Sequence, residues 1–244
     1  MEKESGCLMQ NRFSPLEVHL SRGNTIFGWT YLLLHALVLP ILLNLYVYFA
    51  PTPPSQLSIN LIYYFAGFAL VVLLGLRRWL RREFDILLDR LLLCVLLLFA
   101  AYFLNNILSM GVMLLLQLLT PILENPNNEA IAAMAGQDYG AMFGLGVFLA
   151  PLVEETLFRG VAFGSLYRRH RVAAYMVSML LFSVYHVWQY ALAYGDPQLL
   201  LYAVQYLPIS FTLCWLYERT GTIWAPTFFH MLINGLSFLS LQIL

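Results

Sequence analysis

Long apolar stretches separated by short polar breaks make up the chain from about residue 26 to its end. A membrane-crossing helix needs roughly 20 apolar residues. By that measure, seven stretches are long enough to cross a bilayer: 26–49, 58–76, 91–119, 141–166, 172–192, 199–217 and 222–243. The pattern therefore predicts an all-α fold, a polytopic transmembrane bundle of about seven spans.

Proline marks two of the breaks between these stretches. The segment Pro51-Thr-Pro-Pro-Ser55 separates the first two spans, and proline ends helices because it lacks a backbone N–H. The linker 120–140 also contains prolines and asparagines. We expect a short helix at the membrane surface over Glu129–Ala135, which would raise the number of helices to eight.

Composition supports a membrane protein and narrows its partners. The chain of 244 residues is 61% hydrophobic and 11% charged, whereas soluble domains carry about 25% charged residues. The formal net charge is zero, so we expect no nucleic-acid partner. The three cysteines are far apart, which predicts neither a cysteine metal site nor a disulfide framework.

Lysine and arginine are concentrated in alternate breaks. Apart from Arg159, they precede the first span or lie between spans two and three, four and five, and six and seven. With seven spans these breaks share one side of the membrane. The only charged residues in the opposite breaks are acidic: Glu124, Glu129, Asp138 and Asp196. The positive-inside rule then predicts a cytoplasmic N-terminus and cytoplasmic basic loops.

Three ionisable residues interrupt the fourth apolar stretch. Glu154, Glu155 and Arg159 lie within six residues of one another, and each charge at membrane depth costs at least ~2.5–3.5 kcal/mol. Such groups need partners inside the bundle. The spans that follow supply His186, His230 and Asn234.

Helical rise predicts that these groups lie at similar depths. Glu154 is 13 residues from Tyr167, the cytoplasmic end of its span, which is roughly 20 Å. His186 has a similar depth in the next span. His230 and Asn234 lie roughly 12 and 18 Å into the last span. We therefore expect three helices to bring an acid, two imidazoles and an amide together.

Helical spacing separates the roles of the two glutamates. Glu155 and Arg159 are i,i+4 neighbours and can pair on one face. Glu154 points about 100° away from its neighbour, so it can face a cavity. His230 and Asn234 are also four residues apart and share a face.

This set of groups suits hydrolysis by an activated water. A glutamate beside a histidine can act as a general base, and a second histidine with an asparagine can donate hydrogen bonds to an oxyanion. The chain has no Gly-x-Ser-x-Gly nucleophile elbow. Two histidines and a glutamate could instead bind zinc, but the His-Glu-x-x-His pattern is absent and Arg159 would oppose a cation. We expect no cofactor, with zinc as the alternative.

The same residues resemble the three motifs of a known family. Glu154-Glu155-x-x-x-Arg159, Phe182-x-x-x-His186 and His230-x-x-x-Asn234 are similar to those of the CAAX prenyl endopeptidase and bacteriocin-processing family. This family of intramembrane proteases is also called Abi or CPBP. The resemblance covers about residues 141–236.

The resemblance implies an intramembrane glutamic endopeptidase of a bacterial cell membrane. By resemblance, Glu154 is the general base assisted by His186, and His230 and Asn234 form the oxyanion hole. Glu155 and Arg159 support the site electrostatically, no zinc is bound, and the site opens to the cytosol. We accordingly divide the chain into an N-terminal cytoplasmic segment, three accessory spans and a four-span catalytic core, at 1–25, 26–119 and 141–243.

Other functions fit the same sequence. The chain could be a non-enzymatic membrane partner, for instance in bacteriocin self-immunity, or a zinc-dependent version of the protease. A proton-coupled transporter would also use buried acids, but we find no inverted repeat. For a protease, the expected partners are membrane lipids and a peptide or protein substrate. Prenylated proteins, leader peptides and membrane-protein tails are all open as substrates.

Overall fold

The computed structural model describes residues 16–17, 20–119 and 125–242. Every regular element within these ranges is helical, as the hydrophobic pattern predicts. The predictions for Cys7, Pro121, Glu124 and most of the N-terminal segment lie outside the described residues.

Six of the expected spans correspond to helices that are long and apolar enough to cross a membrane. They are Arg22–Phe49, Gln56–Gly75, Leu91–Leu118, Tyr139–Tyr167, Arg171–Tyr194 and Pro197–Thr220. The seventh expected span corresponds to α13, Trp224–Leu241. It is not among the six, and His230 and Asn234 contribute to its lower hydropathy. The chain is an integral membrane protein.

Several spans combine α-helix with wider π-helical turns. The first consists of α1 (Arg22–Leu33), η1 (Leu34–Val38) and α2 (Leu39–Phe49), and the second of α3 (Gln56–Gly67) and η2 (Phe68–Gly75). The third is α5 (Leu91–Leu119), and the fourth runs through α7 (Tyr139–Phe143), η3 (Gly144–Leu149), α8 (Ala150–Glu155), η4 (Thr156–Phe163) and α9 (Gly164–Tyr167). The fifth is α10 (Arg171–Tyr185) with α11 (Trp188–Tyr194), and the sixth is the 3-10 helix η5 (Pro197–Tyr206) with α12 (Leu207–Thr220).

Two further helices lie between spans. α4 (Arg77–Asp89) joins the second span to the third, and α6 (Pro126–Gln137) precedes the fourth. The short helix expected over Glu129–Ala135 is therefore present and longer than predicted. Asn125 starts α6, because its side chain accepts a hydrogen bond from the backbone N–H of Asn127.

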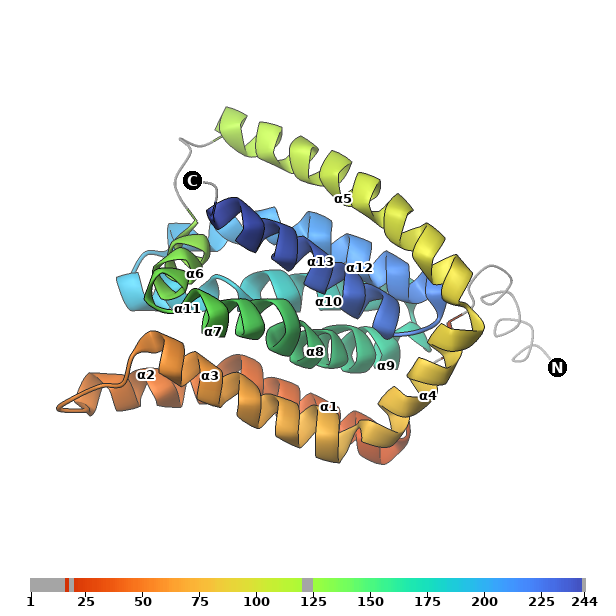
Figure 1. The fold of residues 1–244 in the computed structure, drawn as a ribbon, viewed down its shortest axis with the longest axis horizontal. Helices are drawn as coiled ribbons and strands as arrows, with labels where there is room; N and C mark the ends of the chain where they lie inside the picture. Colours follow the sequence, from red (N-terminus) through yellow and green to blue (C-terminus); the bar gives the residue numbers. More distant parts are fainter. Residues whose placement is uncertain (1–15, 18–19, 120–124, 243–244) are drawn as a thin grey trace.

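The fourth span lies in the middle of the bundle. Figure 1 shows α5 along one side of the molecule and the α1–α3 hairpin along the opposite side, with α8 and α9 between them. In its most apolar window, 61% of the fourth span is buried, against 17% for the α5 span. The span that carries both glutamates is thus the one that other helices surround.

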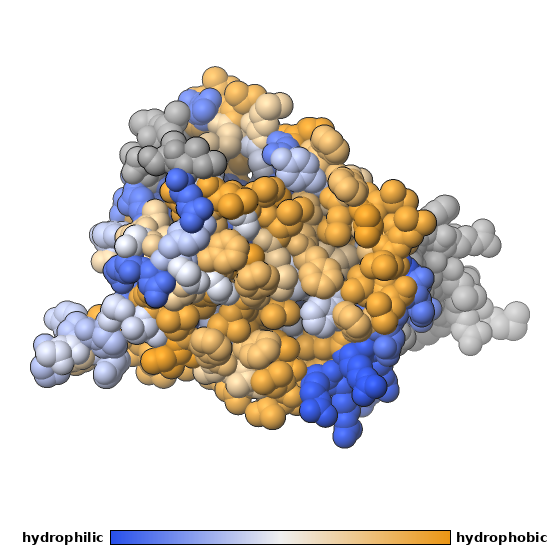
Figure 2. Space-filling view, viewed as in Figure 1, coloured by the Kyte–Doolittle hydropathy of each residue, from blue (hydrophilic) through white to orange (hydrophobic). Residues whose placement is uncertain are grey.

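α4 is an amphipathic helix at one end of the bundle (Figure 1). Its four arginines from Arg77 to Arg82 are exposed, and Figure 2 shows hydrophilic residues gathered at this end. Its Trp79 is 2% exposed and packs on Gly160, where an added Cβ would lie 2.5 Å from the indole ring. A glycine in η4 therefore lets α4 seat closely on the central span.

Candidate active site

The two glutamates end α8, between the π-helical segments η3 and η4. Glu154 is 3% exposed, and Glu155 and Arg159 are fully buried. Wider π-helical turns occur frequently at functional sites. Three ionisable groups thus lie inside the bundle, so their surroundings must supply their hydrogen bonds.

Glu155 and Arg159 form the ion pair that their spacing predicts. Arg159 Nη1 lies 3.0 Å from Glu155 Oε1. Its Nη2 donates to Ser210 Oγ at 2.9 Å, and the guanidinium lies 4.1 Å from the ring centroid of Phe182. Side chains from the fifth and sixth spans therefore stabilise the buried guanidinium of Arg159.

Glu154 uses its two carboxylate oxygens differently. Oε1 accepts a hydrogen bond of 2.6 Å from the Tyr64 hydroxyl. Oε2 lies 4.0 Å from His186 Nε2 and 3.9 Å from His230 Nε2. Glu154 therefore lies beside both histidines, as the sequence analysis predicts.

The Nδ1 atoms of both imidazoles have hydrogen-bond partners. His186 Nδ1 lies 2.8 Å from the Phe182 carbonyl oxygen, and His230 Nδ1 lies 2.8 Å from Glu155 Oε1. A carbonyl or carboxylate oxygen only accepts, so Nδ1 donates in each case. When neutral, each ring therefore presents an unprotonated Nε2 to Glu154.

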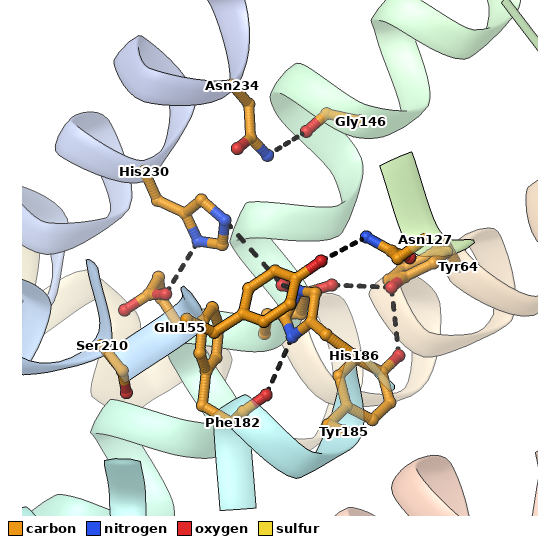
Figure 3. Close-up of polar contacts among 12 residues, drawn as sticks. Tyr64, Asn127, Gly146, Glu155, Phe182, Tyr185, His186, Ser210, His230 and Asn234 are labelled. Atoms are coloured by element: carbon orange, nitrogen blue, oxygen red, sulfur yellow. Dashed lines mark hydrogen bonds and ion pairs between the residues drawn. The ribbon is translucent and has the colours of Figure 1, made fainter. Parts of the chain in front are cut away.

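Asn234 is placed differently from the other predicted residues. Its Nδ2 donates to the Gly146 carbonyl at 2.8 Å, and Figure 3 shows the amide turned toward Gly146. The close approach depends on glycine, because an added Cβ at Gly146 would lie 2.8 Å from the Phe238 ring. Among the described residues, no hydrogen bond joins Asn234 to the Glu154 cluster, which consists of Tyr64, Glu154, Glu155, Arg159, His186 and His230.

The sequence analysis missed the aromatic side chains that complete the site. Tyr64 comes from α3, an accessory span, and its hydroxyl lies 3.0 Å from that of Tyr185. The Tyr206 ring stacks on His186 with centroids 4.4 Å apart. These tyrosines belong to none of the three motifs. The one feature of the sequence that could have indicated them is a phenol hydroxyl at membrane depth.

A cavity of about 370 Å³ adjoins these residues. Tyr64, Tyr185 and His186 form its inner wall, and its other walls come from α2, α3, α6 and α11. These elements meet at the end of the bundle away from α4 (Figure 1). The resemblance, combined with the expected topology, predicts an opening at the arginine-bearing end instead.

The distances within the cluster are longer than those between the ligands of a bound zinc ion. Within the described ranges, no group of three His, Cys, Asp or Glu side chains is arranged to hold a metal ion. Tetrahedral ligands about 2.0–2.1 Å from zinc lie roughly 3.4 Å apart, whereas both imidazoles lie about 4 Å from Glu154 Oε2.

Comparison with known proteins found one family model and one relative that are similar to part of this chain. Residues 137–236 match the family model of type II CAAX prenyl endopeptidases, described as Rce1-like. The "Putative membrane peptidase YdiL" of Bacillus subtilis (strain 168) is 31% identical over 112 residues, which is 46% of this chain and 41% of that protein. The alignment thus spans less than half of that relative. No solved structure matches the chain.

The matched segment contains all three motifs and every residue of the Glu154 cluster except Tyr64. The motifs and the family model thus cover the same helices. Residues 137–236 are therefore similar to the CAAX prenyl endopeptidase and bacteriocin-processing (CPBP) family.

Proposed function

We propose that this protein is an intramembrane endopeptidase in which Glu154 activates a water to hydrolyse a peptide bond. The observation that carries the proposal is the position of Glu154 Oε2, about 4 Å from the Nε2 atoms of both His186 and His230. A water can bridge two polar atoms at this separation with hydrogen bonds of about 2.8 Å each.

In the first step Glu154 takes a proton from this water as its oxygen attacks the substrate carbonyl carbon. The hydrogen bond from Tyr64 to Oε1 leaves Oε2 as the free oxygen. His186 orients the water through its unprotonated Nε2, since its Nδ1–H is bound to Phe182. A C–O bond forms and the carbonyl oxygen becomes an oxyanion.

His230 is the group that stabilises this oxyanion. Its Nδ1–H is bound to Glu155, so donation from Nε2 requires the doubly protonated ring. Two cations, His230 and Arg159, then stand beside two carboxylates, Glu154 and Glu155, and the four charges balance. Asn234 has one further N–H to donate, because the other is bound to Gly146. Glu154 then returns its proton to the leaving amine as the C–N bond breaks.

A mechanism without a metal ion is compatible with the ion pair between Arg159 and Glu155, which lies next to Glu154. Arg159 lies 3.0 Å from Glu155, and a guanidinium this close to the carboxylates opposes a divalent cation. In the proposed mechanism the same pair holds Glu155 in place to orient His230.

The purified protein in detergent tests the proposal with a library of quenched fluorescent peptides as substrate. Glu154→Gln keeps the shape of the side chain and removes the base, so we expect at least about a 100-fold loss of cleavage, with a similar loss for His186→Ala. Glu129→Gln, at an exposed position on α6, serves as the control and should cleave normally. Full cleavage by Glu154→Gln would refute the mechanism, and a cellular function that survives this change would favour the non-enzymatic alternative.

A further inference from the structure

His35 lies in the π-helical turn η1 of the first span, and such turns occur frequently at functional sites. Its side chain is fully buried, and its ring stacks on Tyr63 with centroids 4.2 Å apart. An added Cβ at Gly67 would lie 3.4 Å from its Cε1, so a glycine lets α3 pack closely against the imidazole. An ionisable side chain is thus enclosed between the first two spans.

The backbone around His35 ties this turn to the second span. The Leu39 N–H bonds to the Leu34 carbonyl, and the next residue, Pro40, has no N–H. The His35 carbonyl therefore has no helical N–H to accept from at the i→i+5 spacing of the turn. The Tyr63 hydroxyl donates to this carbonyl instead, which fixes η1 beside α3.

A series of side chains joins His35 to Glu154. His35 Nε2 lies 3.4 Å from Tyr185 Oη, which lies 3.0 Å from Tyr64 Oη. The Tyr64 hydroxyl donates to Glu154 Oε1 at 2.6 Å, and Figure 3 shows the link between the two phenols. The four groups come from the first, second, fourth and fifth spans, so the series crosses the bundle.

The other ring nitrogen of His35 indicates which way this series runs. Among the residues that the structure describes, Nδ1 is buried without a hydrogen-bond partner. A proton on Nδ1 would leave a buried N–H without an acceptor, which costs free energy. Nε2 would then also take the single hydroxyl hydrogen of Tyr185. A neutral ring with its proton on Nε2 avoids both, and this N–H can donate to the Tyr185 oxygen.

The two phenols then donate in one direction. With His35 donating to its oxygen, Tyr185 can give its own hydrogen to the Tyr64 oxygen, 3.0 Å away. Tyr64 donates to Glu154, because a carboxylate oxygen only accepts. Each phenol thus accepts from one neighbour and donates to the next, and hydrogen bonds in such a chain strengthen one another.

We propose that His35 is a positioning residue for Glu154, as the donor that begins a one-way chain of hydrogen bonds through two tyrosines. This inference rests on the proposed peptidase function. By strengthening the hydrogen bond to Oε1, the chain holds the carboxylate with Oε2 about 4 Å from the two imidazoles of the cluster. The first span thereby takes part in orienting the proposed base.

Cleavage of the quenched peptides in detergent tests the proposal with two substitutions of His35. His35→Leu removes the donor, and we expect kcat to fall at least about tenfold while KM stays within about twofold. His35→Gln retains an N–H near the position of Nε2, so its kcat should stay within about threefold of the wild type. Tyr31→Phe is the matched control in the same span, because it removes a buried hydroxyl that has no partner among the described residues. Equal losses in the two His35 variants would overturn the proposal.

A double-mutant cycle tests whether His35 acts through Tyr185. Tyr185→Phe removes the hydroxyl that follows His35 in the chain. If the chain carries the effect, His35→Leu should lower the kcat of the Tyr185→Phe protein by less than about twofold, since groups in one network are not additive. A loss of about tenfold in both backgrounds would mean that the two residues act independently, and would overturn the proposal.

The tautomer of His35 can be measured without a substrate. In detergent micelles, the NMR chemical shifts of isotope-labelled histidine nitrogens show which nitrogen carries the proton, and His35→Gln identifies the signal. We expect the proton on Nε2 in His35 but on Nδ1 in His186, whose Nδ1 lies 2.8 Å from the Phe182 carbonyl oxygen. A proton on Nδ1 of His35 would overturn the proposal. Absence of Glu154-dependent cleavage in the wild type would instead count against the peptidase function, and the tautomer would still report the direction of the chain.

Discussion

Tyr64 connects an accessory span to the proposed base. Its hydroxyl donates to Glu154 Oε1 over 2.6 Å and lies 3.0 Å from the Tyr185 hydroxyl, which itself lies 3.4 Å from His35 Nε2. His35 is fully buried and stacks on Tyr63 with ring centroids 4.2 Å apart. A chain of hydrogen bonds from the first and second spans thus fixes the orientation of the carboxylate.

Tyr64→Phe tests this orientation. A hydrogen bond to a charged group is worth about 1.5–3 kcal/mol, so we expect kcat to fall roughly 10- to 100-fold while KM stays unchanged. Tyr217→Phe is the matched control, because Tyr217 is also fully buried and does not contact the site. An unchanged kcat in Tyr64→Phe, or a loss confined to KM, would contradict the role of Tyr64.

Metal removal separates the glutamate mechanism from the zinc alternative. Because Arg159 neutralises Glu155 and the imidazoles stand about 4 Å from Glu154, we expect EDTA or phenanthroline to leave cleavage within about twofold of its starting rate. A zinc peptidase treated in the same buffer provides the control. Loss of cleavage that added zinc restores would establish the alternative.

At the residue scale, the candidate site could be predicted because charged side chains inside a membrane carry a high free-energy cost. Glu154, Glu155 and Arg159 stand out because charge in a membrane interior is expensive, and the two histidines follow as their partners. Tyr64 could not be predicted in this way, since a phenol in an apolar span costs little and has no fixed spacing from the motifs. The hydrogen bond of Asn234 to Gly146 depends on how closely α13 approaches η3, which helical spacing does not determine.

At the scale of elements, α4 holds the start of α13 in place. Glu83 Oε2 accepts a hydrogen bond from the Ile223 backbone N–H at 3.0 Å, and Thr222 Oγ1 donates to the Glu83 carbonyl at 2.6 Å. The Trp224 indole donates to the Leu80 carbonyl. The helix that carries His230 and Asn234 is therefore anchored by an amphipathic helix at the membrane surface.

Glu83 makes this anchor sensitive to pH. Burial raises the pKa of Glu83 from 4.5 to about 7, so the folded protein binds a proton more tightly than the unfolded chain does. Stability should therefore fall as pH rises from about 5 to 7, by up to roughly 3 kcal/mol. Thermal unfolding in detergent across this range should show the fall in the wild type and in Asp85→Asn, an exposed control on the same helix, and a flatter profile in Glu83→Gln. Parallel profiles for Glu83→Gln and the wild type would contradict the assignment.

For the whole molecule, hydropathy was enough to predict where the spans lie in the sequence. The contacts between the spans determine their local helix geometry and the position of the cavity. Lipid requires every backbone group to be bonded within a helix, so apolar length alone predicted the six long helices. The π-helical turns on either side of α8 and the position of the cavity depend on contacts between distant helices, which have no period in the sequence. The accessory hairpin α1–α3 consequently forms part of the site rather than only flanking it.

The most direct test of the central claim compares the protein N-termini in membranes that contain the wild-type chain with those in membranes that contain Glu154→Gln, both inserted at equal levels. If Glu154 activates the hydrolytic water, a set of new N-termini will be present with the wild type and absent with the variant. Identical sets of N-termini in the two membranes would contradict a peptidase that depends on Glu154.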